Sequence, residues 1–282
     1  MRHPLLLTLA TTAALGAAAF GARRVLADAA ARDAERALLA EPSGGTFSEA
    51  RLDGLPEPAR RYLRHAVAPG TPLASACRLR MTGVLTPAPG ASPVELTATE
   101  TIAPRWGFVW TARARMMGVP VLVRDHYWRG EGGVAVTALG VVPVPLGGPS
   151  SDVARSARGR LVGEGVWCPT ALVHPDVRWD DAGPDRACCT VEVDGEPVSV
   201  TLHVGPDGAL HEVTLDRWGD PDGGAFGLYP YGFAVEAEGT FGGVTIPTEI
   251  RGGWRYGTDG FDPTTAVSFS VTDAEPLFSQ VP

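Results

Sequence analysis

From Ala74 onward, apolar and polar residues alternate with a period of two, and turn residues interrupt the alternation about every ten residues. This is the period of a β-strand with one buried face. The candidate strands run from residues 76–85 to residues 265–272, and Asp194-Gly195 and Gly242-Gly243 lie between alternating runs, as in tight hairpins. The pattern predicts a mainly β (α+β) fold, a curved antiparallel sheet or incomplete β-barrel of about eleven strands.

One or two helices are expected to cover this sheet. A serine cap at Ser150 or Ser151 precedes an apolar stripe, which predicts a helix to about Val166 between two runs of strands. Such a helix can cover the open mouth or the inner face of a curved sheet. A shorter stripe before the first strand predicts a second helix, and it consists of Ala59, Tyr62, Leu63, Ala66 and Val67.

The N-terminal region contains an uncharged apolar run, residues 4–21. Its 18 residues are at the short limit for a membrane-spanning helix, which needs roughly 20. A cleaved signal peptide is one interpretation, with residues 17–19 as the small-residue site. An uncleaved anchor is the other, and we favour it because an amphipathic helical pattern continues to Ala40. We therefore expect residues 4–21 to tether the protein to a membrane.

Charge divides unevenly along the chain. Residues 1–80 have a net charge of +4, whereas residues 81–282 have −12. Arginines that follow the apolar run favour a cytoplasmic location for that side, but export remains an alternative. The overall charge of −8 argues against a nucleic-acid-binding protein.

The composition shifts indicate three parts. Residues 1–41 form the anchor and amphipathic helix, residues 42–54 form a linker rich in Pro, Gly and Ser, and residues 55–282 form a single β-rich domain.

Motifs for well-known chemistries are missing from the sequence. The chain has no Lys, no Gly-x-Ser-x-Gly, no His-Glu-x-x-His and no dinucleotide-binding glycine pattern. Its four cysteines have no metal-binding or redox spacing, and we expect them to be small buried apolar residues. We therefore expect no cofactor, no metal and no catalytic residues.

The alternation nevertheless selects candidate ligand-binding residues. Trp106, Phe108 and Trp110 share one strand face, where they would form an apolar lining. Asp125 and Tyr127 share a face of the next strand, and a buried Asp125 would need a partner, for which we select Arg217. The other candidates are Arg160, Glu164, Trp167 and His211.

Arg160 and Glu164 stand four residues apart on the predicted helix, where they form either a surface ion pair or a contact at the cavity mouth. The hairpin turn centred on residues 206–207 pairs Leu202 with His211, which places His211 on the apolar face. In this register the side chains of His203 and His211 point to opposite faces of the sheet. The apolar face is also the predicted location of Arg217.

Several segments together resemble a family of bacterial proteins of unknown function. The resemblance covers about residues 52–272 and rests on RYLRHA, FVWTARARMMGVPVLVRDHYWRGEGGVAVTALGVVPV, ARGRLVGEGVWCPTALV, VRWDDAG, LDRW and IPTEI. The layout is similar to that of the LolA/LolB lipoprotein carriers, which implies an incomplete β-barrel that is filled by helices and holds an acyl chain. The chain departs from a LolB-type protein because no lipoprotein Cys follows its apolar run.

Three functions follow as expectations. The first is a membrane-tethered, non-catalytic binding protein for a lipid or another amphiphile. The second is an enzyme of unknown activity, for example a hydrolase, in which Asp125, Glu164 and His211 would have to converge on one site. The third is a structural or partner-binding module.

Overall fold

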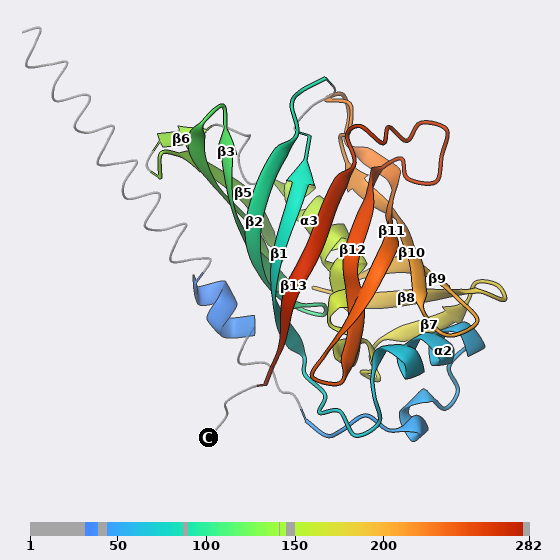
Figure 1. Cartoon of the computed structure of the whole chain (residues 1–282). Helices are drawn as coiled ribbons and strands as arrows, with labels where there is room; N and C mark the ends of the chain where they lie inside the picture. Colours follow the sequence, from blue (N-terminus) through green and yellow to red (C-terminus); the bar gives the residue numbers. More distant parts are fainter. Residues whose placement is uncertain (1–31, 39–43, 87–89, 141, 145–149, 279–282) are drawn as a thin grey trace, which may run out of the picture.

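The computed structural model describes residues 32–38, 44–86, 90–140, 142–144 and 150–278 (Figure 1). Within these residues, all strands belong to one antiparallel sheet of 13 strands. The strands are β1 (Ala76–Leu85), β2 (Val94–Ala103), β3 (Gly107–Met116), β4 (Val119–Trp128), β5 (Glu131–Ala138), β6 (Val142–Val144), β7 (Arg178–Asp181), β8 (Arg186–Val193), β9 (Glu196–Val204), β10 (Leu210–Gly219), β11 (Gly227–Phe241), β12 (Val244–Trp254) and β13 (Val267–Leu277). The expected class of fold is confirmed, but the sheet has 13 strands where about eleven were predicted, and the short β6 is one that the alternation did not predict.

The connectivity explains how the sheet becomes a half-barrel. Each strand pairs with its neighbour in the chain, except that β1 pairs with β13 and that β6 and β7 lie at opposite edges of the sheet. The chain must cross from one edge to the other between β6 and β7. The helices on this crossing are α3 (Ser151–Gly163), η2 (Glu164–Trp167) and α4 (Pro169–Leu172).

Helix α3 fills the inner side of the curled sheet, between β4 and β5 on one flank and β9 and β10 on the other (Figure 1). The Ser150 side chain caps its first turn by accepting a hydrogen bond from the Val153 backbone N–H at 3.2 Å. Small residues allow the close approach: a Cβ added to Gly132 of β5 would lie 2.8 Å from the Ala154 Cα of α3. The predicted covering helix is therefore present, and it covers the inner face.

Two further helices lie between residues 44 and 75, before β1. They are η1 (Glu49–Leu52) and α2 (Glu57–Ala66), and the second matches the predicted stripe of buried residues that includes Tyr62 and Leu63. Helix α2 packs against β7, β8, β9 and β12 and closes the lower end of the half-barrel (Figure 1).

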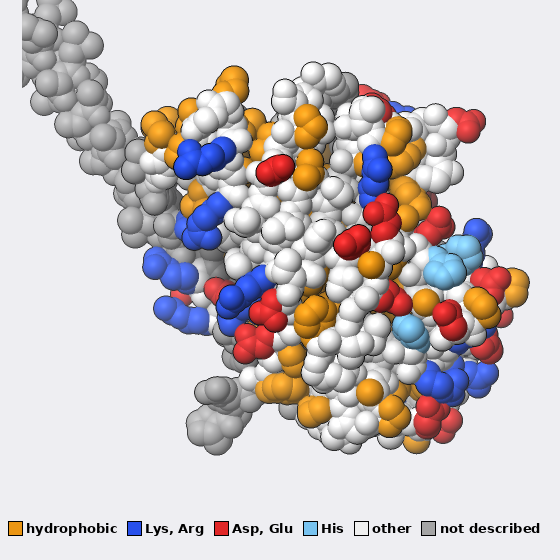
Figure 2. All heavy atoms as spheres, viewed as in Figure 1, with side chains coloured by type: hydrophobic (Ala, Val, Ile, Leu, Met, Phe, Trp, Pro, Cys, Tyr) orange, Lys and Arg blue, Asp and Glu red, His pale blue; other side chains and the backbone are white. Residues whose placement is uncertain are grey.

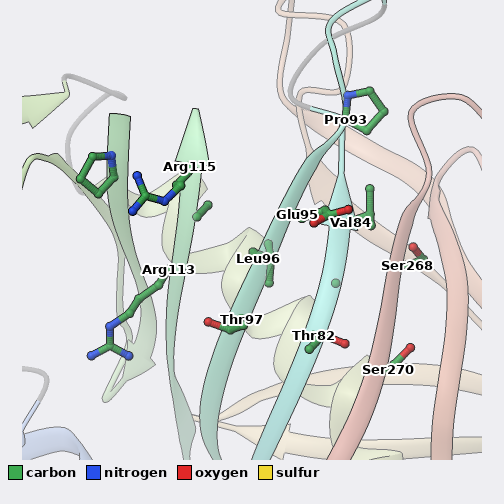
Figure 3. Close-up of a pocket in the computed structure, with 13 residues that line it drawn as sticks. Thr82, Val84, Pro93, Glu95, Leu96, Thr97, Arg113, Arg115, Ser268 and Ser270 are labelled. Carbon is green, nitrogen blue, oxygen red and sulfur yellow. The ribbon is translucent and has the colours of Figure 1, made fainter. Parts of the chain in front are cut away.

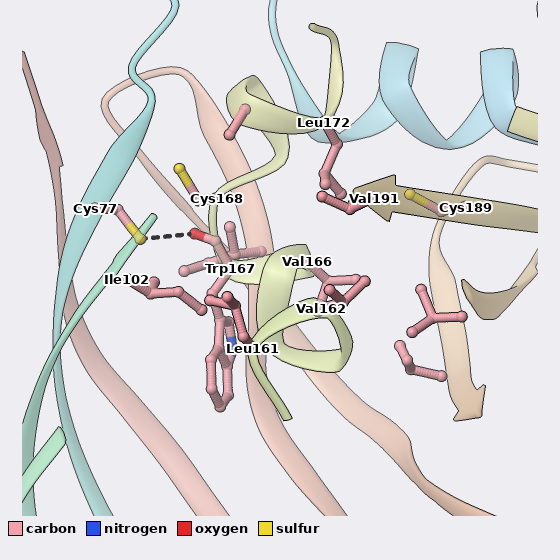
Figure 4. Close-up of a cluster of buried hydrophobic side chains, with 14 of the residues drawn as sticks. Cys77, Ile102, Leu161, Val162, Val166, Trp167, Cys168, Leu172, Cys189 and Val191 are labelled. Carbon is pink, nitrogen blue, oxygen red and sulfur yellow. Dashed lines mark hydrogen bonds between the residues drawn. The ribbon is translucent and has the colours of Figure 1, made fainter. Parts of the chain in front are cut away.

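The hydrophobic core lies between the crossing segment and the sheet (Figure 4). Trp167 is 2% exposed, and its indole N–H donates to the Pro247 carbonyl oxygen at 3.0 Å. The Cys77 thiol donates to the Trp167 carbonyl oxygen at 3.2 Å. All four cysteines are free; Cys188 is half-buried and the other three are buried. These contacts fix η2 against β1 and β12.

The segment of residues 32–38 is helical and packs on the outer face of the sheet. Leu38 is fully buried there, and the Glu35 carboxylate accepts a hydrogen bond from the Thr101 hydroxyl at 3.0 Å and lies 3.2 Å from Arg78. This is part of the predicted amphipathic continuation. The apolar run of residues 4–21 lies outside the described residues. In the part of the chain that the structure describes, no helix is both long and apolar enough to span a membrane.

Candidate functional site

One cross-strand row on the inner face carries an unusual set of side chains. The pairing places Glu100 of β2 opposite Trp110 of β3, and Trp110 opposite Asp125 of β4. Residues directly opposite in an antiparallel pair lie on the same face of the sheet. On β2 the buried neighbours of Glu100 on this face are Ala98 and Ile102, so a carboxyl group occupies a position that the alternation gives to an apolar residue.

Arg160 reaches this row from α3 and binds three acids. Its Nη1 lies 2.6 Å from the Asp125 carboxylate, its Nε lies 2.9 Å from the Glu164 carboxylate, and its Nη2 lies 3.6 Å from Glu100. The guanidinium also lies over the rings of Phe108 and Trp110, at 4.7 and 5.2 Å from their centroids. We call Glu100, Asp125, Arg160 and Glu164 the charge cluster.

The charge cluster is largely removed from water. The Glu100 side chain is 0% exposed, and those of Arg160, Glu164 and Asp125 are 13%, 13% and 16% exposed. Neither Glu100 carboxyl oxygen has a hydrogen-bond partner, and the buried Trp110 indole N–H also has none. Unpartnered buried polar atoms are costly in a folded protein, so their presence here requires a reason.

Burial is the main cause that raises the pKa of Glu100 well above its usual range. The neighbouring Glu164 carboxylate raises this pKa further, and Arg160 opposes the shift without cancelling it. For Arg160, burial acts to lower the pKa, but Glu164, Glu100 and Asp125 together raise it well above its usual value. Glu100 is therefore the member that holds a proton, and Arg160 stays charged. Perturbed groups of this kind gather at functional sites.

A small cavity adjoins the charge cluster. Its volume is about 20 Å³, and it is bounded by Arg160 and Glu164 on the helix side. The sheet side is apolar and aromatic, with Leu215, Tyr231, Phe233, Ile250, Val267 and Phe269. This volume is near the minimum that holds one water-sized group.

Beyond the charge cluster, the inner face of β3 to β6 continues as an apolar wall. Its members follow from the register, because they alternate with outer-face residues and pair with one another across the strands. Five of them are between 37% and 49% exposed: Met116, Val119, Val134, Val142 and Val144. We call these five side chains the open wall. In the space-filling view, hydrophobic side chains gather over the tips of β3 to β6 (Figure 2).

A larger hollow of about 950 Å³ lies on the opposite face of the sheet, over β1, β2, β3 and β13 (Figure 3). Its lining is about half polar, and the polar residues are Thr82, Glu95, Thr97, Arg113, Arg115, Ser268 and Ser270. Helix α3 lies behind the strands in this view, so the hollow is separate from the charge cluster. Its named polar residues are exposed or half-buried, which is typical of a solvated sheet surface.

The structure brings together five of the residues selected from the sequence. Phe108, Trp110, Asp125, Arg160 and Glu164 all meet at the charge cluster. The pairing predicted between Asp125 and Arg217 is wrong, because Asp125 pairs with Arg160. Arg217 does lie on the inner face, where its Nε donates to the Ser156 carbonyl oxygen at 3.1 Å and its guanidinium stacks on Tyr231.

Four other selected residues lie apart from the cluster: Trp106, Tyr127, Trp167 and His211. Trp106 is 38% exposed in the turn before β3, because that strand begins only at Gly107. The Tyr127 hydroxyl donates to Asp194 at 2.7 Å, which ties two hairpins together. Trp167 belongs to the core described above.

His211 was predicted on the apolar face and is exposed instead. A register shift between Leu210 and Glu212 leaves it outside the regular pairing, and Leu202 pairs with Val213. Its ring lies 5.9 Å from that of His203, so the prediction that the two point in opposite directions is also wrong. The convergence of Asp125, Glu164 and His211 on one site is not found. Among the described residues, no group of three potential ligands is placed to hold a metal ion.

Glu100 is the site residue that sequence reasoning missed. The signal was present in VELTATETIA, where Glu100 shares its parity with Leu96, Ala98 and Ile102, while Glu95 has the opposite parity. An acid on the apolar side of a strand needs a partner, and this parity alone would have selected Glu100.

The fold and the site together define a class: a helix-filled antiparallel half-barrel with a buried charge cluster beside an open apolar wall. Residues 45–264 match the family described as Family of unknown function (DUF6544), and the chain belongs to this family. This confirms the resemblance to a family of uncharacterised proteins.

Solved structures from several bacteria are similar to this chain at low sequence identity. A LolA superfamily protein from Nitrosomonas europaea has a TM-score of 0.41 and 11% identity, covering 80% of this chain and 93% of that one. A domain from Vibrio parahaemolyticus with the provisional name outer membrane lipoprotein-sorting protein domain has a TM-score of 0.38 and 9% identity, covering 71% and 85%. A DUF1329 family protein from Desulfovibrio piger has a TM-score of 0.33 and 10% identity, covering 72% and 86%. No curated protein matches the sequence.

Proposed function

We propose that this protein is a non-catalytic binding protein for an amphiphile, a lipid or a lipid-like chain. The observation that carries the proposal is the open wall, five apolar side chains that are 37–49% exposed on the inner face of a half-barrel. Here α3 covers the face only as far as the charge cluster, and the apolar row continues past it.

The open wall supplies affinity for an apolar tail. Burial of apolar surface contributes about 25 cal/mol per Å² before the costs of association. Contiguous exposed apolar surface rimmed by polar groups is typical of a ligand groove. Asp125 and Glu164 provide a polar rim, because their side chains are 16% and 13% exposed and lie between the open wall and α3. A bound chain would place its tail on the wall and its head at this junction.

The test uses a dodecyl chain with a fluorophore at its far end and an uncharged hydroxyl head. We expect the full-length chain to bind this probe and the variants Val119→Asp and Val142→Asp to bind it at least about tenfold more weakly, since each places a charge on the apolar wall. The matched control is Leu228→Asp, because Leu228 is 57% exposed and lies outside the wall, on β11. Circular dichroism checks that each variant folds. Absence of binding by the unmodified protein, or equal binding by all variants, would overturn the proposal.

The tether to the membrane is a separate part of this proposal. We infer it from the uncharged run of residues 4–21, whose 18 residues approach the length of a membrane span. Fractionation of cells that express the full chain, followed by N-terminal sequencing, tests it. The expected product is membrane-bound and begins at its original N-terminus. A soluble product that begins near Phe20 would show that the run is a cleaved leader.

A further inference from the structure

We propose that the head group bound at the charge cluster is a primary ammonium, so that the ligand is a cationic amphiphile with a small amine head. This inference rests on the proposed function, because it concerns the polar end of the same ligand. It adds the charge and the size of the head.

The first argument is the balance of charge. Three carboxyl groups, those of Glu100, Asp125 and Glu164, face one guanidinium within 3.6 Å. A buried net negative charge is costly unless it gains a positive partner. When Glu100 is protonated, the cluster still contains two carboxylates, those of Asp125 and Glu164, against the single guanidinium of Arg160. A cation at this position completes the neutralisation.

The second argument is the unpartnered acceptor. Glu100 is 0% exposed, points into the cluster toward Arg160, and has no hydrogen bond on either carboxyl oxygen. A protonated carboxyl group keeps a carbonyl oxygen that accepts hydrogen bonds, and the Asp125 and Glu164 carboxylates beside it accept more. An ammonium has three donors and no acceptor, so its hydrogen-bonding capacity complements a set of carboxyl groups. An anionic head would be repelled by the Asp125 and Glu164 carboxylates, which already hold the guanidinium of Arg160.

The third argument is size. The cavity beside Arg160 and Glu164 has a volume of about 20 Å³, which holds roughly one water-sized group. An ammonium is of this size, whereas a trimethylammonium or a phosphate ester is several times larger. Apart from Arg160 and Glu164, the lining of the cavity is mainly apolar and aromatic and includes Tyr231, Phe233 and Phe269. Glu100 and Asp125 do not line this cavity, so it limits the size of the head group and the acids of the charge cluster favour its positive charge.

The experiment measures how three amphiphiles displace the fluorescent probe from the full-length chain at pH 7.5, each below its critical micelle concentration. They are dodecylamine, dodecanol and dodecanoate, which share the chain length and differ in the head. We expect dodecylamine to bind about tenfold more tightly than dodecanol, and dodecanoate to bind more weakly than dodecanol, because charge-assisted hydrogen bonds form only with the amine. Dodecyltrimethylammonium tests the size limit and should lose most of the preference.

Variants locate the preference. Glu164→Gln should reduce the advantage of dodecylamine over dodecanol to about twofold or less, because it removes one charge and keeps the shape. Glu95→Gln is the matched control, since Glu95 is exposed on the outer face of the same strand as Glu100. Equal binding of the three dodecyl compounds would overturn the amine inference and leave the proposed function standing. A preference that survives Glu164→Gln and Glu100→Gln would also overturn it, and failure of every compound to bind would overturn both proposals.

Discussion

The inner face of this half-barrel has two parts that share strands and differ in what covers them. In the covered part, α3 packs on β4, β5 and β10, and buried residues such as Leu161 and Tyr127 are 0% exposed. In the open wall, inner-face residues of the same strands β3 to β5 are more than a third exposed. The same alternation therefore produces a core in one part and an exposed apolar surface in the other.

The boundary between the covered part and the open wall lies at the charge cluster. The charge cluster lies at this boundary, because Arg160 belongs to the helix and Asp125 belongs to a strand that continues into the open wall. A buried ion cluster adds little net stability compared with apolar packing, but removal of one member is costly. This position agrees with the binding role that we propose for the cluster.

The largest expected effect comes from breaking the cluster on the helix side. Arg160→Met removes the guanidinium and leaves Asp125, Glu164 and Glu100 without their cation, which should destabilise the protein by about 3–5 kcal/mol. Urea unfolding measures this. The control is Arg80→Ala, where the ion pair with Asp273 is more than half exposed on both sides and should contribute less than about 1 kcal/mol. Similar losses in the two variants would mean that the cluster is effectively solvated.

A smaller effect is expected where the helix meets the sheet. Gly132→Ala places a Cβ 2.8 Å from the Ala154 Cα and 3.2 Å from the Ala157 Cβ, so α3 must shift outward, at a cost of about 1–3 kcal/mol. Gly224→Ala is the matched control, because a Cβ there meets nothing within 4 Å. If the covered part is as tightly packed as described, thermal unfolding should show a lower midpoint for Gly132→Ala only. An unchanged midpoint would show that α3 tolerates movement.

The smallest effect is a change in pH dependence. Burial raises the pKa of Glu100 in the folded protein above its unfolded value of about 4.3. The stability that this group contributes is therefore full below about pH 4.3 and is lost as the pH rises through the folded pKa. Glu100→Gln removes this loss, so the variant should gain stability relative to the unmodified protein between pH 4.5 and pH 8. Urea midpoints at the two pH values test it, and parallel changes in both proteins would contradict the buried position of this acid.

Local sequence patterns determined most of the elements. The period of two gave the strands, the turn pairs gave hairpins, and Asp194-Gly195 adopts positive φ values of 53° and 78°, as such a turn requires. The serine cap and apolar stripe located α3, and parity placed Phe108, Trp110 and Asp125 on the inner face. These features depend on neighbours within a few residues, so one sequence contains them.

The tertiary structure alone decided the partners. Asp125 meets Arg160 and not Arg217 because the crossing between β6 and β7 sets the position of α3 along the sheet, and no local pattern encodes that position. The irregular pairing between Leu210 and Glu212 exposes His211 for a related reason. An extra residue in a strand reverses the direction in which the residues before it point, relative to a regular strand. Alternation determines which side chains point inward, whereas the path of the chain across the half-barrel determines which of them meet and where the inner face stays open.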